Sequence, residues 1–291
     1  MLGEIRGEVR FKEPLSFHTS LRIGGPADIF VVPQDVEDIR HALMFADREQ
    51  LPVAVVGGGN NLVVRDRGIR GVVLKLEGCL GRAEYYGEEA LAGAGVGLSA
   101  LIREAAALNL GGIECLVGIP ATIGGALAMN AGTADGWIGD FVSAVYYLHP
   151  DGALGEFKPS GEFGYRAFHL PAGAVLIGCR LQLHRRPLPE IQKEIRARLK
   201  QKKATQPLAL ASAGFVWKNP AGELASRLIE KAGLRGKRVN GAEISSKHAN
   251  FIVNRGAAGA ADILHLMELT RERVHGHFGI TLETEIRILG E

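Results

Sequence analysis

The chain has 291 residues, 39 of them glycine, and its 34 basic and 32 acidic residues give a formal net charge of +2. Glycine is nearly twice as frequent as the average of about 7%, but it follows no three-residue period and proline numbers only 12. A collagen-like or low-complexity chain is therefore excluded, and the balanced charge gives no strong field for nucleic acid or a membrane surface. The glycine excess must belong to ordered turns.

The cysteines and the N-terminus indicate a cytoplasmic protein. Cys79, Cys115 and Cys179 are odd in number and widely spaced, as expected of free thiols in a reducing compartment. Residues 1–13 carry charges of both signs and no apolar run, so we expect no signal peptide. The uncharged run 115–134 is long enough to cross a bilayer, but its glycines and proline argue against membrane insertion.

The first two-thirds of the chain alternates between strands and helices. Helical periodicity predicts helices over residues 36–48, capped by Asp35, and over residues 98–108. The first helix would join two strands into a β-α-β unit. Short apolar segments punctuated by glycine predict strands over residues 28–32, 52–56, 71–75, 89–93, 142–149 and 174–183.

A domain boundary is predicted at Pro187 and Pro189, which precede a basic helix over residues 190–203. The predicted division is a first domain, 1–188, with subdomains of about 1–75 and 76–188, a helical linker, 189–206, and a second domain, 207–291. In the second domain we expect strands over residues 215–217, 251–253 and 283–289, and helices over residues 223–232 and 260–276.

The basic helix admits two interpretations. Its lysines and arginines outnumber its two glutamates, as in an RNA- or phosphate-binding helix. Long cationic side chains also cover a surface while staying hydrated, and we favour a solvated connecting helix that binds no nucleic acid.

Two glycine clusters each follow a predicted strand. Glycines in the first cluster permit positive φ and let backbone N–H groups converge on an anion, although a plain tight turn is the alternative. The second, at residues 93–97, imitates a dinucleotide-binding fingerprint, but Leu98 replaces its third glycine, so we favour a strand-to-helix turn. The first cluster and its polar neighbours are Gly57, Gly58, Gly59, Asn60, Asn61 and Leu62.

A third cluster forms a long track of small residues. Such residues let a ligand lie against the backbone, and threonine and asparagine side chains can hydrogen-bond it; a buried structural loop is the alternative. Two uncharged clusters in one chain favour a large planar cofactor with a diphosphate over a small anion. The track contains Gly118, Ile119, Pro120, Ala121, Thr122, Gly124, Gly125, Asn130, Ala131 and Gly132.

Five segments in order along nearly the whole chain carry a family resemblance. They are residues 18–28 (HTSLRIGGPAD), 56–62, 118–132, Gly164-Tyr165-Arg166 with Lys218-Asn219-Pro220, and 283–287 (ETEIR). Together they resemble the bacterial UDP-N-acetylenolpyruvoylglucosamine reductases, flavoenzymes of peptidoglycan precursor synthesis. The short region after Arg166 is similar to the shorter type II form of that family.

The resemblance implies an α+β protein with the FAD-binding fold of the vanillyl-alcohol-oxidase type, followed by a substrate-binding α+β domain. Loop 57–62 would hold the diphosphate of a non-covalent FAD, and track 118–132 would line the same cofactor, partly near its flavin. NADPH would be the electron donor and a UDP-sugar enol ether the substrate. We expect a monomer.

Two charged residues match the reacting part of the family's site. After hydride reaches the distal carbon of the enol ether, negative charge builds on the α-carbon and its carboxylate. Arg166 is suited to grip that carboxylate, because guanidinium binds it bidentately and stays charged. Glu285 matches the family's glutamate and would need a pKa raised by burial to act beside an anion. Solvent exposure of each residue is the alternative.

The proton donor is where the chain departs from the family. The family places a serine, or a cysteine, where this chain has Phe215, in Ser212-Ala213-Gly214-Phe215-Val216-Trp217-Lys218. A phenyl ring donates no proton. Ser212 as a substitute donor, a bound water, or an altered activity remain open, and we carry Ser212 as the hypothesis.

Three further residues match positions near the sugar nucleotide. Tyr165, Lys218 and Asn219 are predicted to bind substrate, with a core tyrosine, an exposed lysine and a turn-forming asparagine as the structural alternatives. None of the nine histidines has a partner at metal-ligand spacing, so we predict no catalytic metal.

Two other functions stay open beside the reductase. One is another oxidoreductase or oxidase on the same flavin fold. The other is a non-catalytic flavin- or nucleotide-sugar-binding protein, which Phe215 makes conceivable.

Overall fold

The computed structural model describes residues 2–76 and 80–291. Their contacts divide into two compact units. Among the described residues, the first unit comprises residues 2–12, 28–58, 70–76 and 80–201, and the second comprises residues 13–27, 59–69 and 202–291. These bounds differ from the predicted domains, because two early segments pair with the end of the chain and not with their sequence neighbours. One such pairing is parallel, between β4 (Leu62–Val64) and β21 (Arg287–Leu289).

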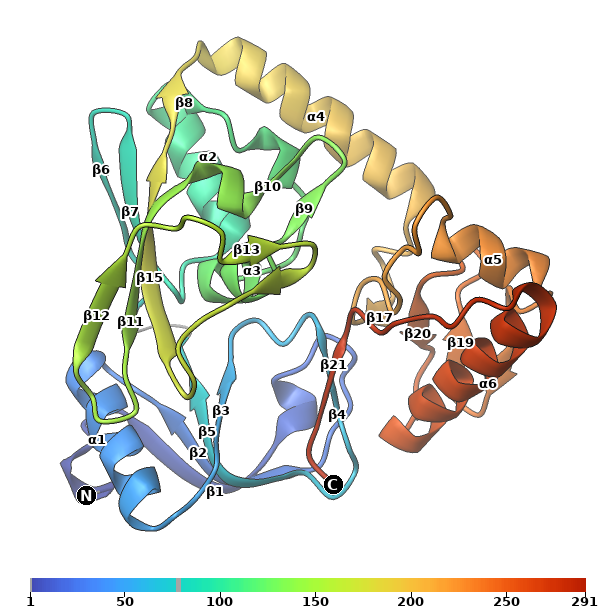
Figure 1. Cartoon of the computed structure of the whole chain (residues 1–291), viewed down its shortest axis with the longest axis horizontal. Helices are drawn as coiled ribbons and strands as arrows, with labels where there is room; N and C mark the ends of the chain where they lie inside the picture. The colour runs from blue at the N-terminus through green and yellow to red at the C-terminus, as the bar shows by residue number, and fades with distance from the viewer. Residues whose placement is uncertain (1, 77–79) are drawn as a thin grey trace. The chain divides into compact units, whose positions relative to one another are not determined.

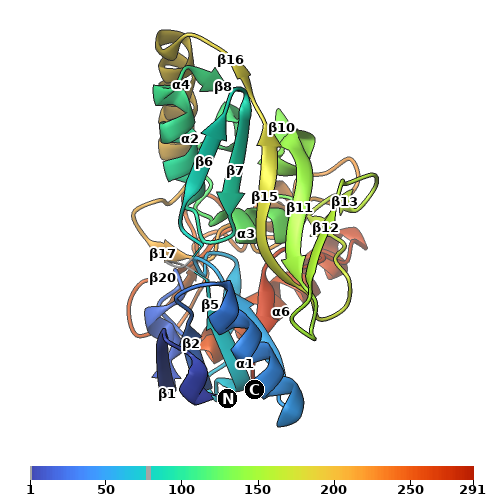
Figure 2. The same cartoon turned by 90° about the vertical axis from the view of Figure 1, so that its left-hand side faces the viewer.

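One sheet of the first unit contains the two strands of the predicted β-α-β unit, β2 and β3, with helix α1 between them in the chain. Strand β3 pairs in parallel with β5, and β5 lies between β2 and β3 in the sheet order β1-β2-β5-β3. Helix α1 begins after Asp35, whose side chain accepts hydrogen bonds from the N–H groups of Glu37 and Asp38, as predicted for its cap. Figure 2 shows α1 beside this sheet. The elements are β1 (Glu8–Pro14), β2 (Pro26–Val32), α1 (Val36–Arg48), β3 (Val53–Val56) and β5 (Ile69–Lys75).

The second sheet of the first unit is antiparallel and has the order β12-β11-β15-β7-β6. Helix α3 contacts β15 and β7, and Figure 1 shows α2 and α3 near these strands. The elements are β6 (Ala83–Tyr86), β7 (Glu89–Gly93), α2 (Leu98–Ala107), α3 (Ile123–Ala128), β11 (Val142–Leu148), β12 (Leu154–Phe157) and β15 (Val175–Gln182).

The first unit also contains the two-stranded sheets β10-β9, β13-β14 and β16-β8, and a long helix, α4, follows them in the chain. Only Ile191 of the long helix α4 is buried, as expected of a solvated connecting helix. Ion pairs of Arg186 with Glu114 and Glu194 link its first turns to the sheet-bearing part of the unit. The elements are β8 (Leu110–Gly111), β9 (Gly132–Thr133), β10 (Gly136–Trp137), β13 (Phe163–Gly164), β14 (Ala167–Phe168), β16 (His184–Arg185) and α4 (Leu188–Thr205).

The second unit packs two helices on a four-stranded antiparallel sheet of order β17-β20-β19-β18. Trp217, fully buried, lies in its hydrophobic core together with Leu21 and Val63 from the two early segments. Those segments therefore belong to this core. The elements are β17 (Ala211–Ser212), α5 (Ala225–Lys231), β18 (Arg238–Val239), β19 (Ala242–Ile244), β20 (Ile252–Asn254) and α6 (Ala260–Phe278).

Two predicted strands differ from the structure. Residues 215–217 are not a strand: only a single bridge joins Trp217 to Thr284. Residues 283–286 are likewise irregular, and the final strand is limited to Arg287–Leu289. Residues 215–217 are apolar enough to resemble a strand, but the bend at Gly214 and the turn that starts at Pro220 leave too few residues for a ladder.

The thiols and the uncharged run lie in ordered regions. Cys115 and Cys179 are buried free cysteines, and burial raises the pKa of each thiol, to about 11 and about 12 respectively. Cys79 lies outside the described residues. Across residues 2–76 and 80–291, no helix is both long and apolar enough to cross a membrane.

Candidate active site

The first and third glycine clusters meet in the first unit. A Cβ on Gly57 would stand 2.3 Å from Oγ1 of Thr122, so only glycine permits this approach. Thr122 caps α3, and its Oγ1 accepts the N–H of Gly125 at 3.3 Å. The two segments predicted to hold one cofactor are thus neighbours at Gly57 and Thr122.

The second glycine cluster supports the third one. Leu98 N–H donates to the carbonyl of Ala121, and Gly124 N–H donates to the carbonyl of Ala94, each at 2.8 Å. A Cβ on Gly95 would approach the carbonyl oxygen of Leu76 to 2.2 Å. Residues 93–97 therefore form a crowded strand-to-helix turn, the interpretation that we favoured from the sequence, and this turn supports the track through hydrogen bonds.

The rest of the first cluster lies in the second unit. Gly59 has φ +64°, and a Cβ there would lie 2.0 Å from the carbonyl oxygen of His18. Ser20 Oγ lies 3.2 Å from the Gly59 carbonyl oxygen and 2.7 Å from that of Ser212. Asn61 donates from Nδ2 to the carbonyl of Glu285 at 3.1 Å. Three of the five matched segments are therefore joined within this unit.

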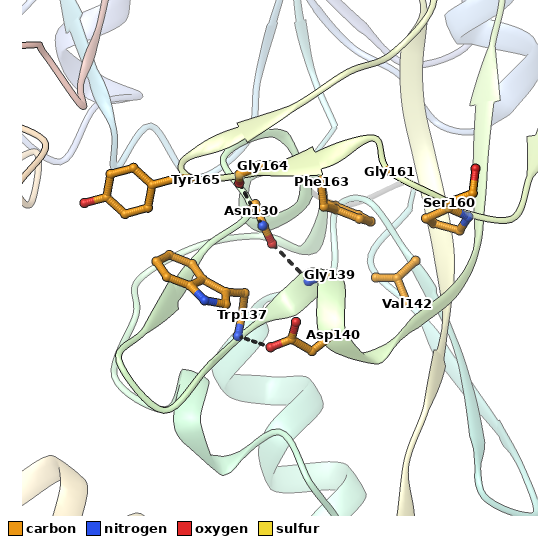
Figure 3. A pocket seen from close by; sticks show the side chains of 11 residues that line it. Asn130, Trp137, Gly139, Asp140, Val142, Ser160, Gly161, Phe163, Gly164 and Tyr165 are labelled. Carbon is orange, nitrogen blue, oxygen red and sulfur yellow. Dashed lines mark hydrogen bonds between the residues drawn. The ribbon is translucent and has the colours of Figure 1, made fainter. Parts of the chain in front are cut away.

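At the far end of the track, the side chain of Asn130 links two neighbouring segments by hydrogen bonds. Its Nδ2 donates to the carbonyl of Gly164 at 2.9 Å, and its Oδ1 accepts the N–H of Gly139 at 3.1 Å (Figure 3). Asn130 is buried and has φ +40°, a conformation that asparagine tolerates better than most residues. Asn130 thereby ties the track to the Tyr165 loop.

Arg166 and Tyr165 form a cation–aromatic cluster with Trp137. The Arg166 guanidinium lies 5.0 Å from the Trp137 ring centre, and its Nη1 donates to the Gly132 carbonyl at 3.2 Å. Trp137 and Tyr165 meet edge to face at 5.6 Å. The sequence motifs do not point to Trp137, and its only sequence signal is its position five residues beyond Gly132, the end of the track.

A pocket of about 460 Å³ opens beside this cluster. Asn130, Trp137, Asp140 and Tyr165 lie around it, and Asp140 accepts the backbone N–H of Trp137 at 2.7 Å (Figure 3). Tyr165 is 47% exposed, so it is not a core tyrosine. The end of the glycine track, the arginine and an aromatic-walled pocket are therefore contiguous.

In the second unit, Phe215 belongs to an aromatic cluster. Its ring stacks on His248 at 5.0 Å and meets Phe251 edge to face at 5.1 Å. Burial lowers the pKa of His248, and its Nδ1 accepts the N–H of Asn250 at 3.3 Å, as expected of a neutral imidazole. Phe215 is thus held by packing.

Ser212, the hypothetical substitute donor, lies three residues before Phe215 at the end of β17. It pairs with Val253 of β20 and is half-buried. Its backbone carbonyl accepts the Ser20 hydroxyl, which links it to the Gly59 loop.

The motif around Lys218 lies against the segment that carries Glu285. Glu285 N–H donates to the Val216 carbonyl at 2.8 Å, and Lys218 N–H donates to the Glu283 carbonyl at 2.9 Å. The Lys218 ammonium also lies 3.4 Å from a Glu283 carboxylate oxygen. Glu283 is exposed whereas Glu285 is half-buried, so the two glutamates have different environments.

Asn219 has a structural task. Its Oδ1 accepts the N–H of Ala225 at 3.0 Å, at the first residue of α5. The side chain therefore stabilises the helix start, beyond forming a turn before Pro220.

The residues of the two glycine segments suit a large anionic cofactor. They are small and uncharged, and the buried ammonium of Lys75 lies 2.6 Å from the Gly57 carbonyl oxygen. A positive charge beside a loop of backbone N–H groups complements a diphosphate. Among the described residues there is no cluster of three or more His, Cys, Asp or Glu side chains that could hold a metal ion.

Comparison with known proteins decides the family. The profile of the C-terminal domain of UDP-N-acetylenolpyruvoylglucosamine reductase matches residues 206–289, and that of an FAD-binding domain matches residues 27–157. The reductase of Pelobacter propionicus is 43% identical over 289 residues, covering 99% of this chain and 97% of that protein. The reductase of an Anaeromyxobacter species is 46% identical, covering 99% and 90%.

The chain belongs to the UDP-N-acetylenolpyruvoylglucosamine reductase family. The crystal structure of the Thermus caldophilus reductase has a TM-score of 0.84 and 38% identity, covering 98% of this chain and all of that one. The predicted resemblance, the α+β fold with its FAD-binding domain and the nature of the protein as an FAD-containing oxidoreductase of peptidoglycan precursor synthesis are confirmed.

Proposed function

We propose that this family member reduces the enolpyruvyl double bond of UDP-N-acetylglucosamine-enolpyruvate to give UDP-N-acetylmuramate, with NADPH as the electron donor. The observation that carries the proposal is the match to the reductases over nearly the full length of both chains, with an FAD-binding domain at residues 27–157. The cytoplasm is the compartment where NADPH and the UDP-sugar would be available, and we propose that the chain acts there as a monomer.

Gly57 to Leu62 and the track from Gly118 to Gly132 would hold FAD. The proposal is supported by the contact of Gly57 with Thr122 and by the uncharged, small-residue character of both segments. The chemistry that bound FAD supplies is hydride transfer, from NADPH and then to the distal carbon of the double bond.

Arg166 would bind the substrate carboxylate. Its guanidinium is held by the Gly132 carbonyl and the Trp137 ring at the end of the track, so little rotamer entropy would be lost on binding. Negative charge that develops on the enolpyruvyl group would gain a charge-assisted hydrogen bond there.

Ser212 would deliver the proton to the α-carbon, and Glu285 would lie beside the same group. The proposal is supported by their backbone links within one unit: Ser212 through Ser20 to the Gly59 loop, and Glu285 through Asn61 to the same loop. Tyr165, Lys218 and Asn219 would contact the sugar nucleotide.

An anaerobic two-step experiment tests the function. NADPH should bleach the yellow flavin of the purified protein, and subsequent UDP-N-acetylglucosamine-enolpyruvate should restore the colour. Bleaching without recovery would contradict this substrate, and turnover in air without NADPH would identify an oxidase on the same fold.

A further inference from the structure

Lys75 is the single lysine that is buried among residues 2–76 and 80–291, with 9% of its surface exposed. It is the last residue of β5. Lysine is rarely buried, because removing its ammonium from water is costly. The position of this ammonium therefore calls for a functional explanation.

The parallel register of β3 and β5 brings Lys75 to the glycine loop. Lys75 is the partner of Val56, the last residue of β3, and Gly57 follows directly. Parallel strands end at the same edge of a sheet, so the lysine side chain reaches the turn that leaves β3. Its Nζ donates to the Gly57 carbonyl oxygen at 2.6 Å.

This hydrogen bond fixes the orientation of one peptide group. In a trans peptide the C=O of one residue and the N–H of the next point in opposite directions. With the Gly57 carbonyl held toward Lys75, the N–H of Gly58 faces the other side of the loop. Thr122 packs closely against Gly57, where a Cβ would stand 2.3 Å from its Oγ1.

The same ammonium supplies charge where the loop has none. Residues 57–62 and 118–132 contain no charged side chain. A buried positive charge is screened less by solvent and salt than an exposed one. Its field therefore favours a dianionic ligand at the loop.

We propose that Lys75 positions the diphosphate-binding loop, orienting the Gly57–Gly58 peptide and providing the positive charge that selects the diphosphate of the cofactor. This inference rests on the proposed function, since it takes FAD as the ligand of the loop.

The experiment measures binding of FAD and of riboflavin, which has the same flavin ring but no phosphate, to the apoprotein by quenching of flavin fluorescence. We expect Lys75→Met to raise the Kd of FAD about tenfold or more, since each tenfold corresponds to about 1.4 kcal/mol. The Kd of riboflavin should change less than twofold. Lys158→Met, an exposed lysine of the same unit, is the matched control and should leave both values unchanged.

Equal weakening of FAD and riboflavin, with an unchanged melting temperature, would overturn the proposal, as would an unchanged Kd for FAD. If wild-type protein binds no FAD, the proposed function itself fails, which is a distinct outcome.

A measurement on the wild-type protein does not depend on how Lys75→Met folds. In protein labelled with ¹⁵N-lysine, the Nζ signal of Lys75, assigned with Lys75→Arg, should move when ADP is added and stay in place with adenosine. A Lys75 signal unaffected by saturating ADP would contradict the proposal.

Discussion

The glycine clusters and the motif around Phe215 use their residues in opposite ways. At Gly57, Gly59 and Gly95 a missing Cβ allows the backbone to approach its neighbours closely, and the surface offered to a ligand is mainly main chain. Around Phe215 the side chains carry the structure: a phenyl ring stacks on His248, and Asn219 holds a helix start.

The difference teaches how far a motif can be transferred between relatives. A backbone site survives changes in neighbouring side chains, so a glycine pattern predicts it well. A site made of single side chains can lose its key group while the motif around it persists, as at Phe215.

The largest expected effect comes from adding a side chain at Gly59, in the first glycine cluster. Gly59→Ala should destabilise the protein by about 4 kcal/mol or more, because the new Cβ would lie 2.0 Å from the His18 carbonyl oxygen. Gly87 is the matched control: its φ is +63°, close to that of Gly59, but nothing lies within 4 Å. Gly87→Ala should cost only the left-handed conformation, about 1–2 kcal/mol. Urea unfolding measures both, and equal losses would refute the role of close approach.

The next effect concerns the proton donor. Ser212→Ala should slow substrate-dependent reoxidation of the flavin about 100-fold, the size expected of a lost general acid. Adding Phe215→Ser to this variant should recover much of the rate, because it places a hydroxyl where the family has one.

Anaerobic stopped-flow absorbance measures these rates, and Ser246→Ala, an exposed serine of the same unit, is the control. An unchanged rate in Ser212→Ala would eliminate Ser212 as the donor.

A smaller effect tests the sheet that carries Ser212. Hydrogen bonds from Arg255 and Arg238 hold the pKa of the buried Glu243 carboxyl below its usual value near 4.5. This stabilisation is present above about pH 4.5 and is lost as pH falls through the lowered pKa. Because both guanidinium groups reach solvent, Glu243→Gln should cost only about 1–2 kcal/mol at pH 7.

Unfolding of the wild-type and Glu243→Gln proteins at pH 7 and at pH 3 measures the difference, which should shrink at the lower pH. A difference independent of pH would show that the carboxylate charge contributes nothing; Glu156→Gln, at an exposed site, is the control.

The smallest expected effect distinguishes two roles of Asn219, stabilising the start of α5 and binding the UDP-sugar. Asn219→Ala should lower stability by about 1 kcal/mol, because Ala225 N–H loses its acceptor. Asn219→Asp keeps an acceptor oxygen and should keep the stability, but a negative charge there should raise the KM for the UDP-sugar. Thermal melts and steady-state kinetics check the pair, and an unchanged KM in Asn219→Asp would leave Asn219 with a structural role only.

Sequence predicted the fold best where local signals agree. Helix α1 has the predicted bounds because its period and its Asp35 cap coincide. Helix α3 lies within the predicted glycine track, where Gly124 and Gly125 disfavour a helix. The Thr122 cap stabilises it, as do hydrogen bonds from its first N–H groups to the carbonyls of residues 94 and 96.

The candidate site was predictable as a set of segments but not as a set of contacts. Lys75 reads as the end of an apolar strand, and its role depends on a register with β3 that no local pattern encodes. The stacking of Phe215 on His248 joins residues 33 positions apart for the same reason. Such long-range pairings follow from packing of the whole unit.

The pairing of β4 with β21 sets an order of events during synthesis on the ribosome. Leu62–Val64 emerge early, but their parallel partner Arg287–Leu289 is made only after the intervening residues 65–286. The second unit therefore cannot be completed until residues 287–289 have been made, and the early strand must remain unpaired along this edge until then. Long delays of this kind expose a chain to non-native pairing, so this unit is where we would look first for chaperone dependence.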